Sequence, residues 1–147
     1  MNGDSVSVPG TISGNVPATL SLALGTPAGF GAFVPGDARD YLAEMTATVT
    51  STGADAQLSV LDPSSTAPGR LVNGTYALAQ QLQVKANSGA YAPLRSDNGP
   101  LSLLSWTGPV SKEAVTLGFK QTIGAAEGLR TGPYAKTLTF TLSTTAP

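Results

Sequence analysis

The sequence predicts an all-β fold, a single Ig-like antiparallel β-sandwich of about eight or nine strands. Apolar side chains recur at every second position in several segments, as in Val115–Phe119 and Leu138–Leu142. This period of two gives a strand one buried and one exposed face. The 17 glycines and 11 prolines divide the chain into short segments, and no helical period lasts longer than about two turns. A length of 147 residues suits one domain.

The first 16 residues are expected to form an N-terminal arm or edge strand, and residues 17–147 the β-sandwich domain. Val6 and Val8 alternate with serines before Pro9, and proline cannot donate a hydrogen bond to a ladder. Such a segment either pairs within its own sandwich or adds to the open edge of a neighbouring copy, as in donor-strand polymers. Self-association through the arm is therefore one hypothesis about partners.

Two alternating segments follow the arm. The leucines within residues 18–24 predict a strand, and the glycine-rich stretch 25–35 is expected to fold over an end of the core. Residues 41–49 predict a long strand with one apolar face. A turn at residues 53–55 then leads into a strand at 57–60, so these two strands are expected to form a hairpin.

The middle of the chain alternates between loops and short strands. Residues 62–69 and 87–100 are rich in Pro, Gly and Asn or Ser, which predicts loops. Asn73-Gly74 is the strongest local turn signal, because these residues supply the positive φ angles that a two-residue hairpin demands. Strands are predicted over residues 77–85 and Leu101–Trp106.

The C-terminal stretch, residues 113–145, predicts two strands joined by a tight loop. The first covers residues 114–123 and the second residues 134–143, each with one apolar face. Such faces must be buried against another sheet. The second of these strands is therefore expected to close the fold.

Composition narrows the classes of function. The chain has 8 basic and 9 acidic residues, a net charge of −1, and neither histidine nor cysteine. Sparse charge argues against nucleic-acid and membrane partners. The missing residues exclude thiol catalysis, Cys-ligated zinc, iron–sulfur clusters and a histidine general base. No cofactor is therefore expected.

The acidic residues give no support for an enzyme. Glu44 lies on the exposed face of its predicted strand, and most aspartates lie in turns, where Asp binds the local backbone. Asp37 and Asp40, and separately Asp97, offer few of the six or more oxygens that calcium needs. We predict that the protein is not an enzyme, with no catalytic, cofactor-binding or metal-binding residues.

Two aromatic residues are candidates for stacking on a sugar ring. A carbohydrate-binding face presents such rings to solvent. Trp106 shares the parity of Leu104 and is expected to pack inward, whereas Tyr91 lies in a loop and is the more exposed ring. Carbohydrate or cell-wall-polymer binding is therefore an alternative function, with Trp106 and Tyr91 as its candidate site.

Three stretches resemble the bacterial WxL cell-surface domain. Residues 134–142 are similar to its closing strand, in which an aromatic precedes leucine by two positions after a Thr-rich lead-in. Residues 56–60 stand where that family places its first Trp-x-Leu, and residues 20–33 resemble the family's opening strand and Gly-Phe loop. The two tryptophan positions carry Ala56 and Phe140, as in related Ig-like modules of secreted actinobacterial proteins, which also lack these tryptophans.

This resemblance implies an exported, wall-associated module. We therefore expect a non-catalytic structural, spacer or adhesive module of a secreted or cell-surface bacterial protein, with a self-assembling filament subunit as a further alternative. Its expected partners are other domains of a larger surface protein, or a cell-wall polymer. Residues 1–4 show no signal-peptide pattern. The chain is thus either cytosolic or lacks the export signal of its precursor, and the second alternative is favoured.

Lys136 is the remaining candidate site residue. It shares the parity of Leu138 and Phe140, so its stem is expected to enter the edge of the core. Some surface Ig-like domains link such a lysine to an asparagine through an isopeptide bond, and Asn73 and Asn98 are the candidate partners. The ordinary alternative is a buried stem with an ammonium group that reaches water.

Overall fold

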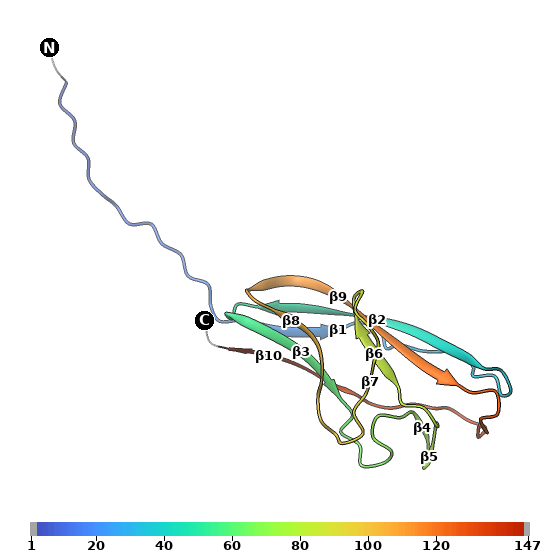
Figure 1. The fold of residues 1–147 in the computed structure, drawn as a ribbon. Helices are drawn as coiled ribbons and strands as arrows, with labels where there is room; N and C mark the ends of the chain where they lie inside the picture. The colour runs from blue at the N-terminus through green and yellow to red at the C-terminus, as the bar shows by residue number, and fades with distance from the viewer. Residues whose placement is uncertain (1–2, 146–147) are drawn as a thin grey trace.

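The computed structural model describes residues 3–145 and is all-β with antiparallel sheets, which confirms the predicted all-β class (Figure 1). No helix among these residues is long and apolar enough to span a membrane. The strands are β1 (Leu20–Leu24), β2 (Arg39–Ser51), β3 (Asp55–Leu61), β4 (Val72–Asn73), β5 (Tyr76–Ala77), β6 (Gln83–Ala86), β7 (Ala92–Pro93), β8 (Leu101–Trp106), β9 (Val110–Ile123) and β10 (Thr139–Thr145).

The strands form two facing sheets and one small hairpin. The larger sheet has the order β1-β2-β9-β6-β7 and the smaller one β10-β3-β8, while β4 and β5 pair with each other. Apolar side chains from the two sheets fill the space between them, as in a β-sandwich. The rings of Phe119 in β9 and Phe140 in β10 meet across this core, with centroids 6.5 Å apart.

The long pair β2–β9 lies within the larger sheet and joins its other strands. It pairs antiparallel from Arg39 opposite Ile123 to Val49 opposite Glu113. From Tyr41 onward the odd-numbered residues of β2 are buried or half-buried, whereas Leu42 on the other face is exposed. The predicted strand over residues 41–49 is thus confirmed, and Tyr41 faces inward as expected.

The predicted hairpin between residues 41–49 and 57–60 is wrong. β2 belongs to the larger sheet and β3 to the smaller one, so residues 52–54 form an arch from one sheet to the other. The neighbours of β2 are β1 and β9, and those of β3 are β10 and β8. A short polar turn leads into an arch as readily as into a hairpin, so local sequence does not distinguish them.

The tight loop predicted within the C-terminal stretch is also wrong. β9 and β10 lie in different sheets, and residues 124–138 connect them as a long irregular segment. β10 begins at Thr139 rather than at residue 134, because Ala135 pairs with Val72 in an isolated bridge instead of with β3. β10 does pair along β3 and so completes the smaller sheet.

Short strands account for most other differences in the middle of the chain. The hairpin at Asn73-Gly74 exists, but Gly74 (φ +63°) and Thr75 form its turn, and Asn73 is the last residue of β4. This placement of glycine is typical of a type II′ turn. The strand predicted over residues 77–85 is reduced to β6, whereas β8 has the predicted bounds. The described residues form ten strands instead of the predicted eight or nine. Three of the ten, β4, β5 and β7, have only two residues each.

The described part of the N-terminal arm, residues 3–16, contains no strand and is exposed throughout. It extends away from the sandwich in Figure 1. The chain joins the domain at Thr19, whose backbone N–H donates to Thr52 Oγ1 (2.7 Å) and whose carbonyl accepts from the Thr52 N–H (3.0 Å).

Candidate functional site

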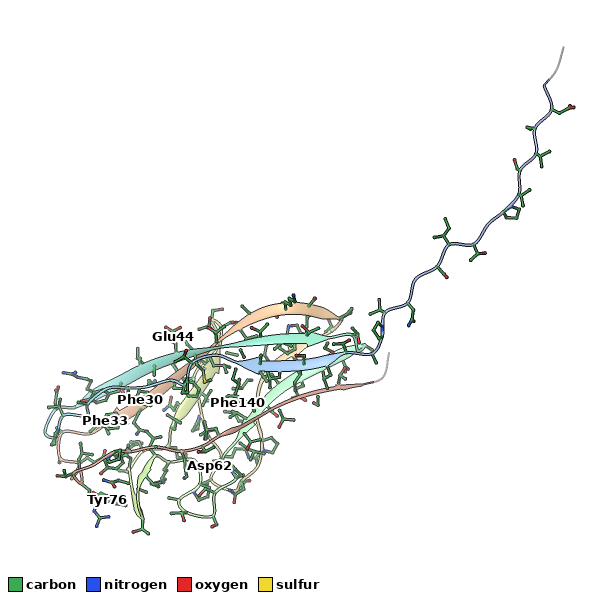
Figure 2. All side chains as sticks on the ribbon, turned by 180° about the vertical axis from the view of Figure 1, so that it is seen from behind. Phe30, Phe33, Glu44, Asp62, Tyr76 and Phe140 are labelled. Carbon is green, nitrogen blue, oxygen red and sulfur yellow. The ribbon has the colours of Figure 1, made fainter. Side chains whose placement is uncertain are left out.

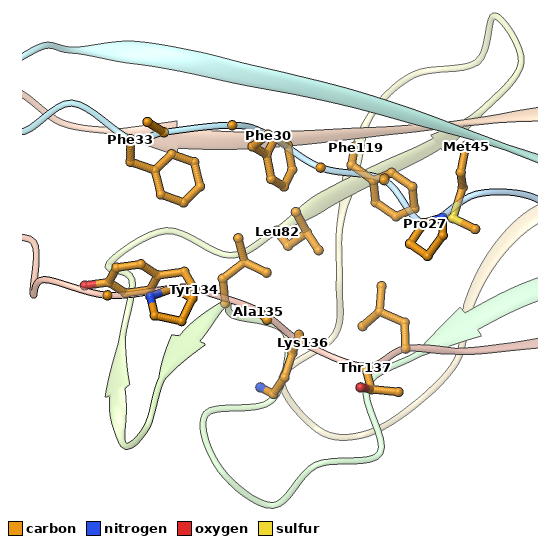
Figure 3. Close-up of a pocket in the computed structure, with 18 of the residues that line it drawn as sticks. Pro27, Phe30, Phe33, Met45, Leu82, Phe119, Tyr134, Ala135, Lys136 and Thr137 are labelled. Atoms are coloured by element: carbon orange, nitrogen blue, oxygen red, sulfur yellow. The ribbon is translucent and has the colours of Figure 1, made fainter.

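A wide groove with mostly apolar walls opens along one side of the sandwich (Figure 3). Its two walls are the segment that follows β1, residues 24–35, and the segment that leads into β10, residues 129–140. Met45, Leu82 and Phe119 also line it, and its volume is about 920 Å³. We call it the apolar groove.

The first wall exists because the chain leaves the larger sheet early. The β1–β2 ladder ends at Leu24 opposite Ala47, and the Gly25 N–H donates one further bond to the Thr46 carbonyl (2.7 Å). The following residues are rich in glycine and proline, which disfavour a regular strand. The described part of β2 from Arg39 to Met45 therefore has a ladder partner, β9, on one side only.

Aromatic rings hold this wall in place. Phe30 and Phe33 point into the space between the sheets, while Glu44 lies on the outer face (Figure 2). The Phe33 ring contacts those of Phe30, Tyr41 and Tyr134 at centroid distances of 5.9, 4.9 and 6.1 Å. The Tyr41 hydroxyl accepts a bond from the Val34 N–H (2.8 Å). The wall is thus packed at several points, although it makes no regular ladder.

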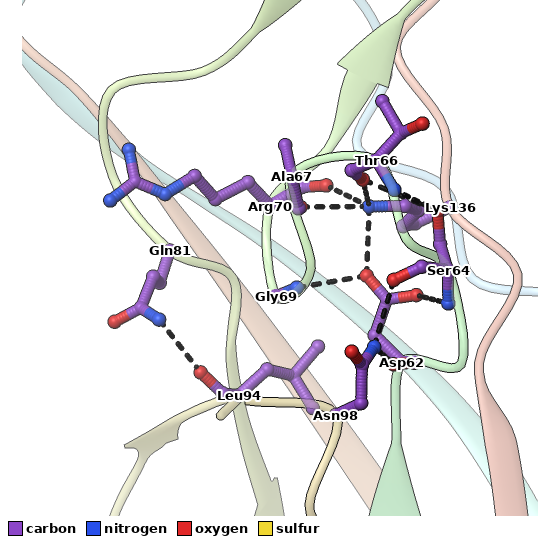
Figure 4. A network of polar contacts seen from close by, with 10 residues as sticks. All are labelled: Asp62, Ser64, Thr66, Ala67, Gly69, Arg70, Gln81, Leu94, Asn98 and Lys136. Carbon is purple, nitrogen blue, oxygen red and sulfur yellow. Dashed lines mark hydrogen bonds and ion pairs between the residues drawn. The ribbon is translucent and has the colours of Figure 1, made fainter. Parts of the chain in front are cut away.

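A buried ion pair lies beside the groove (Figure 4). The Lys136 ammonium is 2.8 Å from Asp62 Oδ2, and the two side chains are 6% and 0% exposed. The same ammonium donates to three backbone carbonyls, at 2.8–2.9 Å, which belong to Thr66, Ala67 and Arg70. A single lysine in the lead-in to β10 thus joins that segment to the loop after β3.

The Asp62 carboxylate is equally well satisfied. It accepts bonds from the N–H groups of Ser64 (2.9 Å) and Gly69 (2.8 Å) as well as from Lys136. Burial by itself raises the pKa of Asp62, but these hydrogen bonds and the charge of Lys136 together hold it below its ordinary value. Asp62 is therefore ionised at neutral pH, as an ion-pair partner requires.

The structure places the two asparagines proposed for a link to Lys136 differently. Asn73 is part of the β4–β5 hairpin and donates to the Thr131 carbonyl (2.9 Å). Asn98, with φ +62°, donates to the carbonyls of Asp62 (2.6 Å) and Ser64 (2.8 Å). Asn98 is thus attached to the loop that holds the ion pair. The Lys136 ammonium is buried among oxygens and does not reach water as the ordinary alternative supposed.

The two candidate stacking residues lie in different parts of the fold, Trp106 at the end of a strand and Tyr91 just before β7. Trp106 ends β8 of the smaller sheet, is half-buried against the core, and its indole N–H donates to the Glu113 carboxylate. Tyr91 lies beside the larger sheet, where the ammonium groups of Lys85 and Lys120 are 4.8 and 4.9 Å from the centre of its ring. Each ring therefore has intramolecular partners of its own.

The expectation that most aspartates lie in turns holds only in part, because Asp40 belongs to β2 and Asp55 to β3. Asp37 pairs with Arg39 (2.6 Å) and Asp97 with Arg95 (2.7 Å), each two residues apart on the surface. A two-point hydrogen bond from Arg95 lowers the pKa of Asp97 to about 2. Within residues 3–145, no three acidic side chains gather in a way that could hold a metal ion.

Sequence reasoning missed the apolar groove and the partner of Lys136. Residues 20–33 did carry a signal for the groove, since a leucine strand runs into a stretch too rich in glycine to continue it. Asp62 carried a weaker one: it directly follows the buried end of a strand instead of standing in the middle of a turn. Its pairing with Lys136 depends on the topology, which no local pattern contains.

Neither models of protein families, nor curated proteins, nor solved structures match this chain.

Proposed function

We propose that the chain is a non-catalytic structural or adhesive module of a secreted or cell-surface bacterial protein, and that it acts by protein contact at the apolar groove. The observation that carries this proposal is the groove itself, about 920 Å³ of mostly apolar space between two extended walls. Large apolar concavities on a protein surface mark sites of interaction.

The chemistry of the walls favours an apolar polypeptide as the bound group. Apolar residues form most of the groove lining, among them four phenylalanines and five leucines. Of its cationic residues, Lys136 is engaged by Asp62, and Arg130 is exposed with its guanidinium 5.9 Å from the centre of the Tyr76 ring. The groove therefore offers contact area and backbone edges rather than reacting groups.

The proposed location on a bacterial surface rests on the resemblance of residues 20–33, 56–60 and 134–142 to the WxL domain. Two of these stretches, the first and the last, line the groove in part. The partners that fit are other domains of a larger surface protein, whose extended segments can lie between the walls. Spacer modules of this kind need a rigid fold, and the buried Lys136–Asp62 pair ties two distant segments together.

Binding of a sugar or wall polymer through Trp106 and Tyr91 is the alternative. It predicts retention of the chain on insoluble glycan and loss of that retention in a variant with both rings replaced by alanine. We expect no such retention, because each ring is already engaged, Trp106 by Glu113 and Tyr91 by two lysines.

Titration with a fluorescent apolar dye tests whether the groove is open in solution. The chain should bind the dye saturably, and Phe30→Ser should weaken binding because Phe30 lines the groove. Leu42→Ser is the matched control, since Leu42 is exposed on the outer face of β2. Absence of dye binding, or equal loss in both variants, would contradict the proposal. Thermal melts of each variant would establish that it is folded.

A further inference from the structure

We propose that the apolar groove of one copy receives the N-terminal arm of a second copy as an added strand. This inference rests on the proposed function, because it names the partner of the same groove. The arm carries four apolar side chains that are almost fully exposed: Val6 (89%), Val8 (81%), Ile12 (99%) and Val16 (75%). Apolar side chains concentrated on one exposed segment indicate a surface that is buried in an assembly.

The arm has the pattern of a strand with one apolar face. Val6, Val8, Ile12 and Val16 all stand at even positions, with glycine at positions 10 and 14, and the odd positions hold polar residues or proline. The same parity continues into the leucines of β1. In an extended chain these even-numbered side chains point to the same side. The arm can therefore insert one continuous apolar face between the groove walls.

The prolines leave one edge of the arm complete. Backbone groups of successive residues in a strand point to opposite edges, so Pro9 and Pro17, both at odd positions, remove donors from a single edge. In the domain that edge faces β2, since Thr19 and Gly25 make the bonds to β2. The other edge keeps every N–H group from Val6 to Val16. This edge can therefore pair with a second strand. The edge that carries the prolines cannot form a complete ladder.

One wall of the groove offers an edge to pair with. In the lead-in to β10, Ala135 exchanges both backbone hydrogen bonds with Val72 (3.0 and 3.2 Å). In an extended chain the backbone groups of its neighbours Tyr134 and Lys136 point the opposite way, away from Val72, and both residues line the groove. Residues 134–140 span about 20 Å when extended and residues 6–16 about 33 Å. The arm is therefore long enough to cover this wall.

Charge also matches. Asp4 is the only charged residue in the arm, and Arg130 is an exposed cation at one end of the groove wall. An arm that runs from the Arg130 end toward Phe140 brings these two groups to the same end. Opposite charges at the rim of an interface fix orientation more than they add affinity.

A second copy is a better source of the strand than the same chain. The arm leaves the domain at Thr19, beside the end of β2. The groove begins beyond the opposite end of β1. To reach its own groove the chain would have to reverse direction within residues 13–18 and use them as a turn. Val16 would then lie in the turn instead of in the groove. A second copy places all four apolar side chains along the walls.

Sedimentation velocity on the whole chain tests the proposal. The average molecular mass of the wild type should rise as the protein concentration is increased to roughly 1 mM. Ile12→Asp should weaken self-association by at least about 100-fold, because it places an unpaired charge in an apolar site. Ser13→Asp is the matched control: it adds the same charge on the polar face of the arm and should associate like the wild type. Both residues are exposed in the single copy, so neither variant should alter folding.

A mixing experiment identifies the groove as the receptor. Phe30→Ser should associate weakly, and a mixture of this variant with Ile12→Asp should form pairs, because one copy supplies an intact arm and the other an intact groove. A wild type that stays monomeric would overturn the inference. It would do so even if hydrogen exchange showed that the arm is protected in the groove of its own chain. Equal association of Ile12→Asp and wild type would overturn it as well. Dye binding by a monomeric wild type would leave the proposed function standing, whereas loss of dye binding would not.

Discussion

Removal of the Lys136 ammonium should strongly destabilise the protein. In Lys136→Met, the Asp62 carboxylate stays 0% exposed and keeps its two backbone hydrogen bonds, but it has no cation, and three carbonyl oxygens lose their shared donor. Breaking a buried ion pair from one side costs about 3–5 kcal/mol of unfolding free energy. At roughly 3 °C per kcal/mol for a domain of this size, the melting temperature should fall by about 9–15 °C.

The loss should depend on pH in a defined direction. In the wild type the pKa of Asp62 is lowered, so its contribution to stability is complete above its ordinary pKa near 4 and is lost as the pH falls through the folded-state value. In Lys136→Met, burial without a cation raises that pKa, so the folded state favours a protonated Asp62. The difference between the two proteins should therefore be largest at neutral pH and shrink as the pH falls below the ordinary pKa of an aspartate.

Calorimetry and urea unfolding would measure these effects, with Arg95→Met as the control. The Arg95–Asp97 pair has similar geometry, but its side chains are 53% and 58% exposed, so its removal should leave the melting temperature unchanged within error. Addition of Asp62→Asn to Lys136→Met should recover part of the loss, because it removes the uncompensated charge. Equal melting temperatures for Lys136→Met and Arg95→Met would refute the reasoning.

Three further predictions concern stability and covalent state. Gly69→Ala should lower the unfolding free energy by about 1–3 kcal/mol or more, because Gly69 has φ +86° and a Cβ there would lie 3.0 Å from a backbone carbonyl oxygen. Gly108→Ala, in open space, is its control in urea titrations. In the same assay Phe119→Ala should lower the unfolding free energy by about 3–5 kcal/mol, because Phe119 is buried. Leu42→Ala should lower it by less than about 0.5 kcal/mol, because Leu42 is exposed. Intact-mass spectrometry should show no loss of water or ammonia, because Lys136 is held as an ion pair with an ionised carboxylate; a lower mass would indicate a covalent link.

Alternation of apolar and polar residues was enough to predict the long strands β2 and β9 and the shorter strand β8. Residues 41–49 and Leu101–Trp106 were located correctly because each has one face that only a core can accept. The choice between a hairpin and an arch at residues 52–54 was not predictable. It depends on which distant strands pair with β2 and β3, and those pairings are long-range.

The candidate site shows the same limit. The parity of Lys136 correctly placed its stem at the edge of the core, but its partner Asp62 is distant in sequence and meets it only because β10 pairs with β3. The glycines that follow β1 were the sequence signal for the apolar groove. The part of its second wall from residue 134 to residue 138 was assigned to a strand, since its alternation resembles one although the ladder begins only at Thr139.

The pairing of β10 with β3 has a consequence for how the chain folds. Thr139 pairs with Leu61 and Ser143 with Gln57, so the smaller sheet is complete only when segments about 80 residues apart in the sequence meet. Contacts of such long sequence separation slow folding to milliseconds or seconds. During synthesis β3 leaves the ribosome long before β10, and until then its apolar side chains lack their final cover.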